Sequence, residues 1–151
     1  MSESFRASVR WQRTSADFHY ESYNRAHDVA FGSGTVIKAS SAPAYRGEPD
    51  RVNPEEQFVG ALSSCHMLTF LAIAAKKRFV VDAYDDDASG VLDRNENGAL
   101  SMTQVTLRPK VVFGGDRYPT DDELTAMHET AHKGCFIAQS VKTDVRCEVR
   151  R

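Results

Sequence analysis

The chain has 151 residues, of which 41% are hydrophobic, and a formal net charge of −2 at pH 7. This length suits a single domain with one core, so we expect residues 1–151 to form one domain. Lys and Arg are scattered rather than clustered, which argues against a nucleic-acid partner. The N-terminus lacks an apolar signal core, and the 3 cysteines are an odd number without close pairing. Both features favour a reducing, cytoplasmic location.

The first third of the chain predicts strands. Apolar residues alternate with polar ones over residues 5–11, from Phe5 to Trp11, which is typical of a half-buried strand. Residues 27–39 predict a hairpin around Gly32 to Gly34. Residues 40–52 are rich in Ser, Pro and Gly and predict a loop.

A long helix should then run over residues 53–78. Asn53 suits the N-cap, Pro54 suits the first helical position, and Glu56 lies three residues past the cap, as in a capping box. From Ala61 to Ala75 the helix is apolar on nearly every face, so a wrapping sheet or a second subunit must surround it.

The same helix contains a stretch that is long enough to cross a bilayer. Residues 57–75 carry no charged side chain, and length alone would permit a membrane span. Polar residues interrupt the stretch, and charges follow at once from Lys76 to Arg78. We therefore expect a buried core helix and no membrane association.

The second half of the chain predicts further strands and one helix. Strands are expected over residues 80–93 and 99–113, with a bulge where the apolar phase shifts between Met102 and Val105. Thr120 and Glu123 form a second capping box, which opens a helix that runs to about His132. Alternation then predicts a last strand over residues 143–149. Helices between blocks of antiparallel strands give an α+β fold class.

The stretch HETAHKGC contains a pattern that is also found in zinc sites. His128, Glu129 and His132 fit H-E-x-x-H, and Cys135 would lie on the same helical face as the histidines. A zinc-dependent hydrolase using this set is a distant alternative, because only a turn and a strand follow to build a cleft. The simpler interpretation is a polar helix end, whose histidines complement the negative end of the helix dipole.

The three cysteines differ in their surroundings. Cys147 shares the inward phase of Val145 and Val149, which predicts a small core residue. Cys135 follows Gly134 at the expected end of a helix, where the chain turns and a thiol can be approached. Cys65 lies in the middle of the long apolar helix.

The segment NPEEQFVGALSSCHMLTF resembles the active-site helix of the OsmC/Ohr family of thiol peroxidases, and is most similar to the OsmC-like branch. The family has N-P-E and, ten residues after the glutamate, a peroxidatic cysteine; Glu55 and Cys65 have this spacing (65 minus 55). Cys135 in HKGCFIAQSV matches the family's second cysteine. The sequence departs from the family at Phe136, where many members have proline.

The resemblance implies antiparallel sheets wrapped around a long central helix, in an intertwined homodimer. It also implies a catalytic arginine, for which three positions are open. Arg25 precedes Glu55 by thirty residues (55 minus 25) and resembles the Ohr placement, so we expect it to be the catalytic residue. Arg46, nine before Glu55 (55 minus 46), resembles the placement in OsmC proper, and Arg51 is a third candidate.

These residues suit the reduction of organic hydroperoxides. Cys65 lies too deep in the helix to gain from the dipole, and burial raises a thiol pKa, so a fixed arginine charge is needed to favour the thiolate. Glu55 is free to hold that arginine, because Glu56 is used in the capping box. Attack on a hydroperoxide would give a Cys65 sulfenic acid, a Cys65–Cys135 disulfide would follow, and a thiol or dithiol reductant would close the cycle.

The apolar helix favours bulky organic substrates, and no cofactor or metal is needed. The alternative from another class is a non-catalytic module with the same fold that binds an apolar small molecule.

Overall fold

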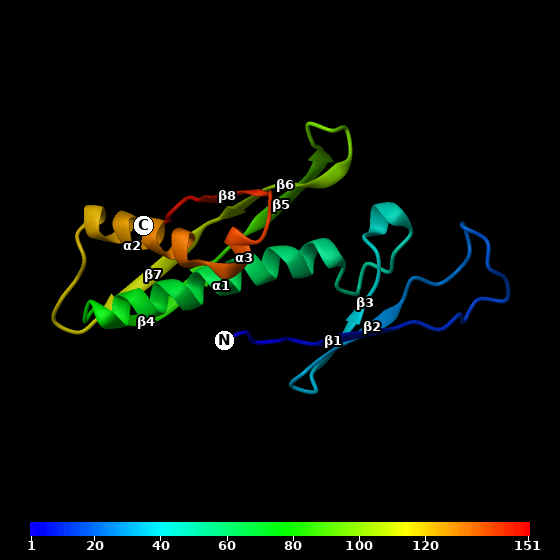
Figure 1. The fold of residues 1–151 in the computed structure, drawn as a ribbon, viewed down its shortest axis with the longest axis horizontal. Coiled ribbons are helices and arrows are strands. Elements are labelled where there is room, and N and C mark those ends of the chain that lie inside the picture. Colours follow the sequence, from blue (N-terminus) through cyan, green and yellow to red (C-terminus); the bar gives the residue numbers. More distant parts are fainter. The chain divides into compact units, whose positions relative to one another are not determined.

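The structure, a computed structural model, describes residues 1–151, whose contacts gather in two units, Met1–Gln57 and Phe58–Arg151. Helices and strands are mixed along the chain, which confirms the α+β class (Figure 1). The single domain expected from the length stays a prediction. The elements are, in chain order, β1 (Ala7–Arg10), β2 (His27–Phe31), β3 (Val36–Ala39), a 3₁₀ turn (Pro43–Tyr45), α1 (Pro54–Lys76), β4 (Val80–Asp86), β5 (Ser89–Arg94), β6 (Leu100–Leu107), β7 (Pro109–Gly114), α2 (Asp121–Gly134), α3 (Phe136–Gln139) and β8 (Asp144–Cys147).

The first unit holds a three-stranded antiparallel sheet in the order β1-β2-β3. The hairpin predicted over residues 27–39 is confirmed, and its turn contains Gly34 at a φ of 88°, a backbone conformation that favours glycine. Strand β1 differs from its expectation, because all four of its residues are exposed. The alternation of apolar and polar residues in β1 predicts one buried face, but that face is exposed in the single chain.

The start of α1 follows the predicted capping box. The backbone N–H of Glu56 donates to Asn53 Oδ1 at 2.8 Å, and the backbone N–H of Asn53 donates to Glu56 Oε2 at 3.1 Å. Two backbone donors that the helix itself leaves without partners are thereby satisfied. Glu55 takes no part in the cap, as the sequence predicts.

Helix α1 is buried along one stripe and exposed along another. Its buried residues are spaced four apart, at Leu62, His66, Phe70 and Ala74. On another side an apolar stripe is exposed, and it comprises Ala61, Ser64, Leu68, Ala72 and Ala75. We expected α1 to be surrounded on all sides, but within the chain it is covered along one side only.

By length and composition, α1 is the one helix that could cross a membrane. The mean hydropathy of its 18-residue window is 1.7, and 22% of that window is buried within the chain. The core helices of soluble proteins have the same length and composition, and the buried stripe of α1 packs against protein. We retain the expectation of no membrane association.

The strands of the second unit form two sheets. Strands β4 and β7 pair in one sheet, and the order in the other is β5-β6-β8. The two long strands predicted over residues 80–93 and 99–113 are each split, the first after Asp86 and the second after Leu107. The second break comes just before Pro109, which cannot donate a ladder hydrogen bond. At the break, the backbone N–H of Arg108 donates to the Asp86 carboxylate at 2.5 Å.

Two details of this sheet bear on the sequence predictions. The register of β6 against β5 skips Thr103, since Val91 faces Gln104 and Leu92 faces Met102. The predicted bulge is confirmed. Strand β8, by contrast, pairs in parallel with β6, so not every strand pair is antiparallel.

Helix α2 packs along the second half of α1. Its predicted capping box between Thr120 and Glu123 is present, which confirms where the helix begins. The two helices share a core with the segment that follows α1. Its buried residues are Phe70, Ala74, Phe79, Met127 and Ala131. The end of α2 is thereby brought to the middle of α1 (Figure 1).

Candidate active site

The structure brings Cys65 and Cys135 together. Cys65 is half-buried in α1, and Cys135 is the C-cap residue of α2. Both are free thiols. Burial raises the pKa of the Cys135 thiol above its usual range, and the neighbouring Cys65 raises it further. Cys65 and Cys135 are therefore neighbours in the fold, although 70 positions separate them in the sequence (135 minus 65).

Cys135 is less accessible than the sequence suggests. It is 1% exposed, because the turn that ends α2 leads straight into α3. The Cys135 Sγ accepts a hydrogen bond from the backbone N–H of Ala138 at 3.4 Å and caps α3. Phe136, the position at which the sequence departs from the expected family pattern, is the first residue of α3 and is 81% exposed. Of the two cysteines, Cys65 is the more exposed.

Arg25 is fixed within its own loop in the first unit. Only 8% of the residue is exposed. Its guanidinium lies 3.5 Å from the ring centroid of Tyr23, donates to the carbonyl of Tyr23 at 2.5 Å, and donates to the carbonyl of Tyr20. An arginine held by a ring face and two carbonyls has little rotational freedom.

The two other candidate arginines have looser surroundings. The Arg46 guanidinium is 5.6 Å from the ring centroid of Tyr20, and Arg51 donates to the carbonyl of His27 at 3.3 Å. None of the three arginines forms an ion pair with Glu55 in the structure. The Glu55 Oε2 atom is buried without a hydrogen-bond partner, so the contact between this carboxylate and an arginine stays a prediction.

The H-E-x-x-H pattern does not form a ligand set. His128 is 3% exposed, whereas Glu129 is exposed and His132 is half-buried. Burial, and then the neighbouring His66, lower the pKa of His128 to about 4. His128 is therefore neutral at pH 7 and does not complement the helix dipole, which corrects the simpler interpretation of this stretch for that residue.

His128 instead meets two residues that no motif joined to it. His66 Nε2 and His128 Nδ1 are 3.0 Å apart, and Cys147 Sγ is 3.9 Å from His66 Nε2. The inward alternation predicted for Cys147 is confirmed, and burial raises the pKa of its thiol to about 12. The sequence signal for His66 is its place between Leu62 and Phe70 on the buried stripe of α1, where a polar residue is unexpected.

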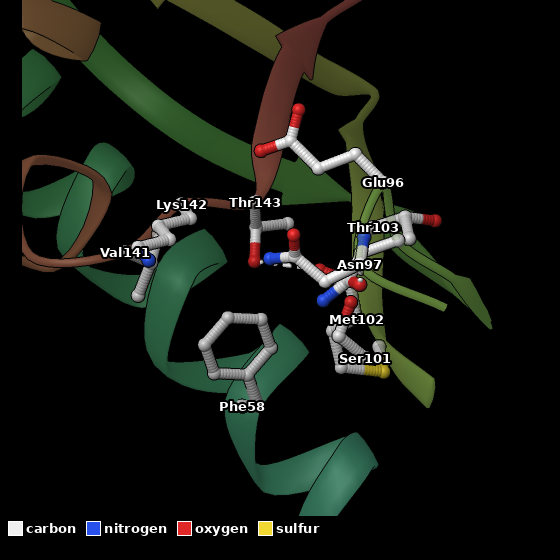
Figure 2. Close-up of a pocket in the computed structure, with 10 residues that line it drawn as sticks. Phe58, Glu96, Asn97, Ser101, Met102, Thr103, Val141, Lys142 and Thr143 are labelled. Carbon is white, nitrogen blue, oxygen red and sulfur yellow. Dashed lines mark hydrogen bonds between the residues drawn. The ribbon is translucent and has the colours of Figure 1, made fainter. Parts of the chain in front are cut away.

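The second unit also has a pocket of about 640 Å³, which is separate from the thiols (Figure 2). It lies between the start of α1, the β5–β6 hairpin and the segment before β8, where Thr143 donates to the carbonyl of Met102 at 2.7 Å. Apolar side chains from Phe58, Met102 and Val141 line it together with polar residues. The lining residues are Phe58, Asn95, Glu96, Asn97, Ser101, Met102, Thr103, Val141, Lys142 and Thr143.

Comparison with known protein families matches residues 47–150 to the model of OsmC-like proteins. The chain belongs to the OsmC family. Among solved structures, an OsmC-like protein of unknown function from Vibrio cholerae is 48% identical over 99% of this chain and 100% of that one, with a TM-score of 0.94.

Two more distant matches extend this picture of the OsmC family. The organic hydroperoxide resistance protein OsmC of Legionella pneumophila shares the fold at 15% identity, with a TM-score of 0.76 over 99% of this chain and 98% of that one. YmaD, an uncharacterized protein of Bacillus subtilis, is 22% identical over 130 residues, which are 83% of this chain and 85% of YmaD.

Proposed function

We propose that this protein is a thiol-dependent peroxidase that reduces organic hydroperoxides. The observation that carries the proposal is that a half-buried Cys65 and a buried Cys135 are neighbours in the fold. Cys65 is the more exposed of the two, and Cys135 lies next to it. This is the arrangement that a peroxidatic and a resolving cysteine require.

The chemistry balances with these two thiols alone. The Cys65 thiolate attacks the terminal oxygen of R–O–OH, the O–O bond breaks, and the leaving alkoxide takes a proton to become the alcohol. Cys65 is then a sulfenic acid. The Cys135 thiol attacks that sulfur, a disulfide forms and water leaves. An external dithiol returns the pair to two thiols by exchange.

Arg25 is the proposed source of positive charge. Its guanidinium would stabilise the Cys65 thiolate and then the leaving alkoxide, in the manner of an oxyanion site. A residue already held by Tyr20 and Tyr23 costs little to order when substrate arrives. Glu55, whose buried oxygen lacks a partner, is the proposed carboxylate that holds the arginine in the active assembly.

The proposal is tested by following the loss of cumene hydroperoxide and of hydrogen peroxide, each with a dithiol reductant. We expect faster turnover of cumene hydroperoxide and no turnover in Cys65→Ser. Stoichiometric peroxide should consume two thiols per chain and give a Cys65–Cys135 disulfide in non-reducing peptide maps. In Cys135→Ser, Cys65 should react once and then persist as a sulfenic acid that is prone to overoxidation.

Equal, slow loss of both peroxides, unchanged in Cys65→Ser, would instead favour the non-catalytic binding module. The matched control is Cys147→Ser, which leaves both proposed redox thiols in place. If the disulfide maps to Cys147, the resolving thiol is misassigned.

A further inference from the structure

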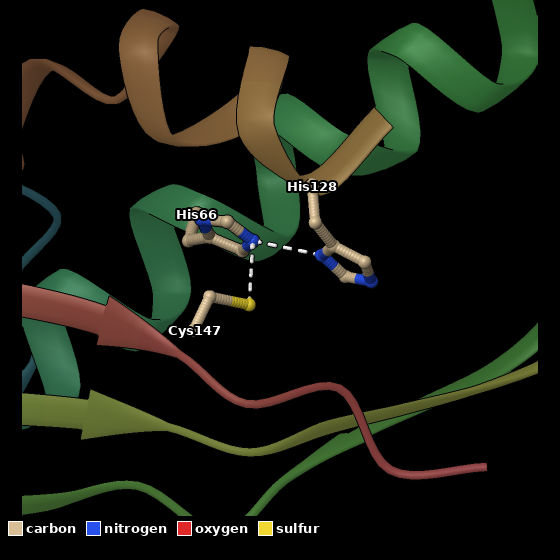
Figure 3. A group of neighbouring side chains, drawn as sticks. All are labelled: His66, His128 and Cys147. Carbon is tan, nitrogen blue, oxygen red and sulfur yellow. Dashed lines mark hydrogen bonds between the residues drawn. The ribbon is translucent and has the colours of Figure 1, made fainter. Parts of the chain in front are cut away.

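Three side chains with metal-binding atoms meet in the interior of the second unit, and neither of the two proposed redox thiols is among them. His66 comes from α1, His128 from α2 and Cys147 from the end of β8 (Figure 3). Their ligand atoms, His66 Nε2, His128 Nδ1 and Cys147 Sγ, all lie within 4.8 Å of one another. The histidines are 1% and 3% exposed, and Cys147 is half-buried.

We propose that His66, His128 and Cys147 form a zinc-binding site that ties α1, α2 and β8 together. Two imidazoles and a thiolate are a donor set that Zn²⁺ prefers. The site uses none of Cys65, Cys135 or Arg25, so it is independent of the proposed peroxidase function.

The spacing of the three atoms is close to that of a tetrahedral zinc site. With Zn–N near 2.0 Å and Zn–S near 2.3 Å, a tetrahedral ion places two nitrogens about 3.3 Å apart and a nitrogen and a sulfur about 3.5 Å apart. The observed separations are 3.0 Å between the nitrogens and 3.9 Å between Cys147 Sγ and His66 Nε2. The third pair, His128 Nδ1 and Cys147 Sγ, lies within 4.8 Å, so side-chain rotations that bring the thiol toward His128 by up to about 1.3 Å would complete the geometry.

Without an ion, the hydrogen bonding of the cluster is incomplete. A neutral imidazole carries one N–H, so the facing nitrogens share at most one hydrogen bond. When His128 donates, the lone pair of His66 Nε2 is used and the thiol has no acceptor there. When His66 donates, the thiol again finds no free nitrogen. A cation would engage all three atoms at once.

Buried polar atoms without partners also belong to the cluster and its surroundings. In residues 58–151 they are Tyr84 Oη and His128 Nε2, the latter being the ring nitrogen of His128 that does not face His66. Tyr84 lies near Cys147, because the charge of Cys147 contributes to the raised pKa of Tyr84, after burial and Asp86. A buried hydroxyl without a partner near the thiol is available to a water bound to the ion.

The charge of the surroundings also suits a cation. Asp86 acts by charge on His66, Tyr84 and Cys147, and its carboxylate accepts hydrogen bonds from Ser63 Oγ and the backbone N–H of Arg108, each at 2.5 Å. No ion pair neutralises it in the structure. A carboxylate held by neutral donors beside the cluster would attract a divalent ion and orient its ligands.

The test uses the full chain, stripped of metal and titrated with Zn²⁺, with bound metal measured by mass spectrometry after gel filtration. We expect one equivalent per chain and a rise in thermal midpoint. Cys147→Ser should lower the Zn²⁺ affinity by about 100-fold or more, since even the loss of a residue that only supports a ligand costs about 10–100-fold. His132→Ala, one turn away from His128 on the same helix, is the matched control and should bind as the parent does.

Cobalt gives a readout that does not depend on the stability of the Cys147 variant. In Cys65→Ser/Cys135→Ser, Cys147 is the sole cysteine, and Co²⁺ should produce a thiolate-to-cobalt charge-transfer band. Less than about a tenth of an equivalent of Zn²⁺ in the parent protein would overturn the proposal. So would a cobalt spectrum without the thiolate band, or loss of binding in His132→Ala with retention in Cys147→Ser.

Discussion

Gly134 lies directly against Thr69: a β-carbon at position 134 would be 3.2 Å from Thr69 Cγ2. This close approach lets the end of α2 reach α1 one turn beyond Cys65, and it places Cys135 beside its partner thiol. Thr69 is itself held in position, since its Oγ1 donates to the carbonyl of Cys65 at 2.9 Å.

We expect Gly134→Val to separate the two thiols and to slow formation of the Cys65–Cys135 disulfide. The larger side chain forces α2 away from α1, whereas oxidation of Cys65 itself does not need α2. A rapid-mixing experiment with one equivalent of cumene hydroperoxide should therefore show sulfenic acid persisting in Gly134→Val. A milder variant, Gly134→Ala, provides a second check. Adding Thr69→Ser to it, which removes the Thr69 methyl group but keeps the hydroxyl, should partly restore its rate of disulfide formation. Equal rates in all of these variants would show that the contact does not position Cys135.

The arginine assignment predicts unequal effects of three similar substitutions. Arg25→Lys keeps the charge but loses the planar guanidinium, so the second-order rate of Cys65 oxidation should fall by about 100-fold or more. Arg46→Lys and Arg51→Lys should remain close to the parent. Stopped-flow measurements with cumene hydroperoxide give the oxidation rate of each variant, and thermal melts confirm that each variant is folded. A large loss in Arg46→Lys alone would move the assignment to that residue.

The exposed stripe of α1 predicts self-association. Leu68 is 60% exposed at its centre, and its neighbours along the stripe are Ala and Ser, which permit close helix packing. We expect a homodimer by light scattering. Leu68→Glu should shift it to monomer, because burying an unpaired charge costs several kcal/mol. Lys76→Glu, at the exposed end of the same helix, is the control. A parent protein that is monomeric at micromolar concentrations would contradict the prediction.

The buried histidine pair predicts a loss of stability in acid for the metal-free protein. Burial, opposed by Asp86, lowers the pKa of His66 to about 4, and the pKa of His128 is lowered to about 4. Both are neutral when folded, and on unfolding they regain a pKa near 6.5. Their stabilisation is thus present above pH 6.5 and is lost as the pH falls toward 4. The loss at pH 5 is on the order of 2 kcal/mol for one such histidine.

Urea unfolding at pH 7 and pH 5, with a chelator present, measures this loss. In His128→Gln, which cannot take up a proton, the difference between the two pH values should shrink. His132→Ala serves as the control on the same helix. If the parent and His128→Gln lose the same free energy of unfolding between these pH values, His128 does not contribute to the acid sensitivity.

Local rules were sufficient for the elements whose interactions are close in sequence. Asn53 and Glu56, or Thr120 and Glu123, satisfy each other within one helical turn, so the starts of α1 and α2 follow from residue types alone. The phase shift before Val105 likewise predicted the bulge at Thr103. The resemblance of the helix around Cys65 then led to the family and to the pairing of Cys65 with Cys135.

Other features depend on distant parts of the chain. The predicted strands break near Asp86 and Pro109. Strand β8 pairs in parallel with β6, because the packing of the chain brings it to that sheet edge. The meeting of His66, His128 and Cys147 needs α1, α2 and β8 to pack together first. Residues 62 and 81 positions apart (128 minus 66, 147 minus 66) share no local pattern. The sequence therefore determined the starts of the two long helices, and only tertiary packing decided where the strands break and which buried polar side chains face one another.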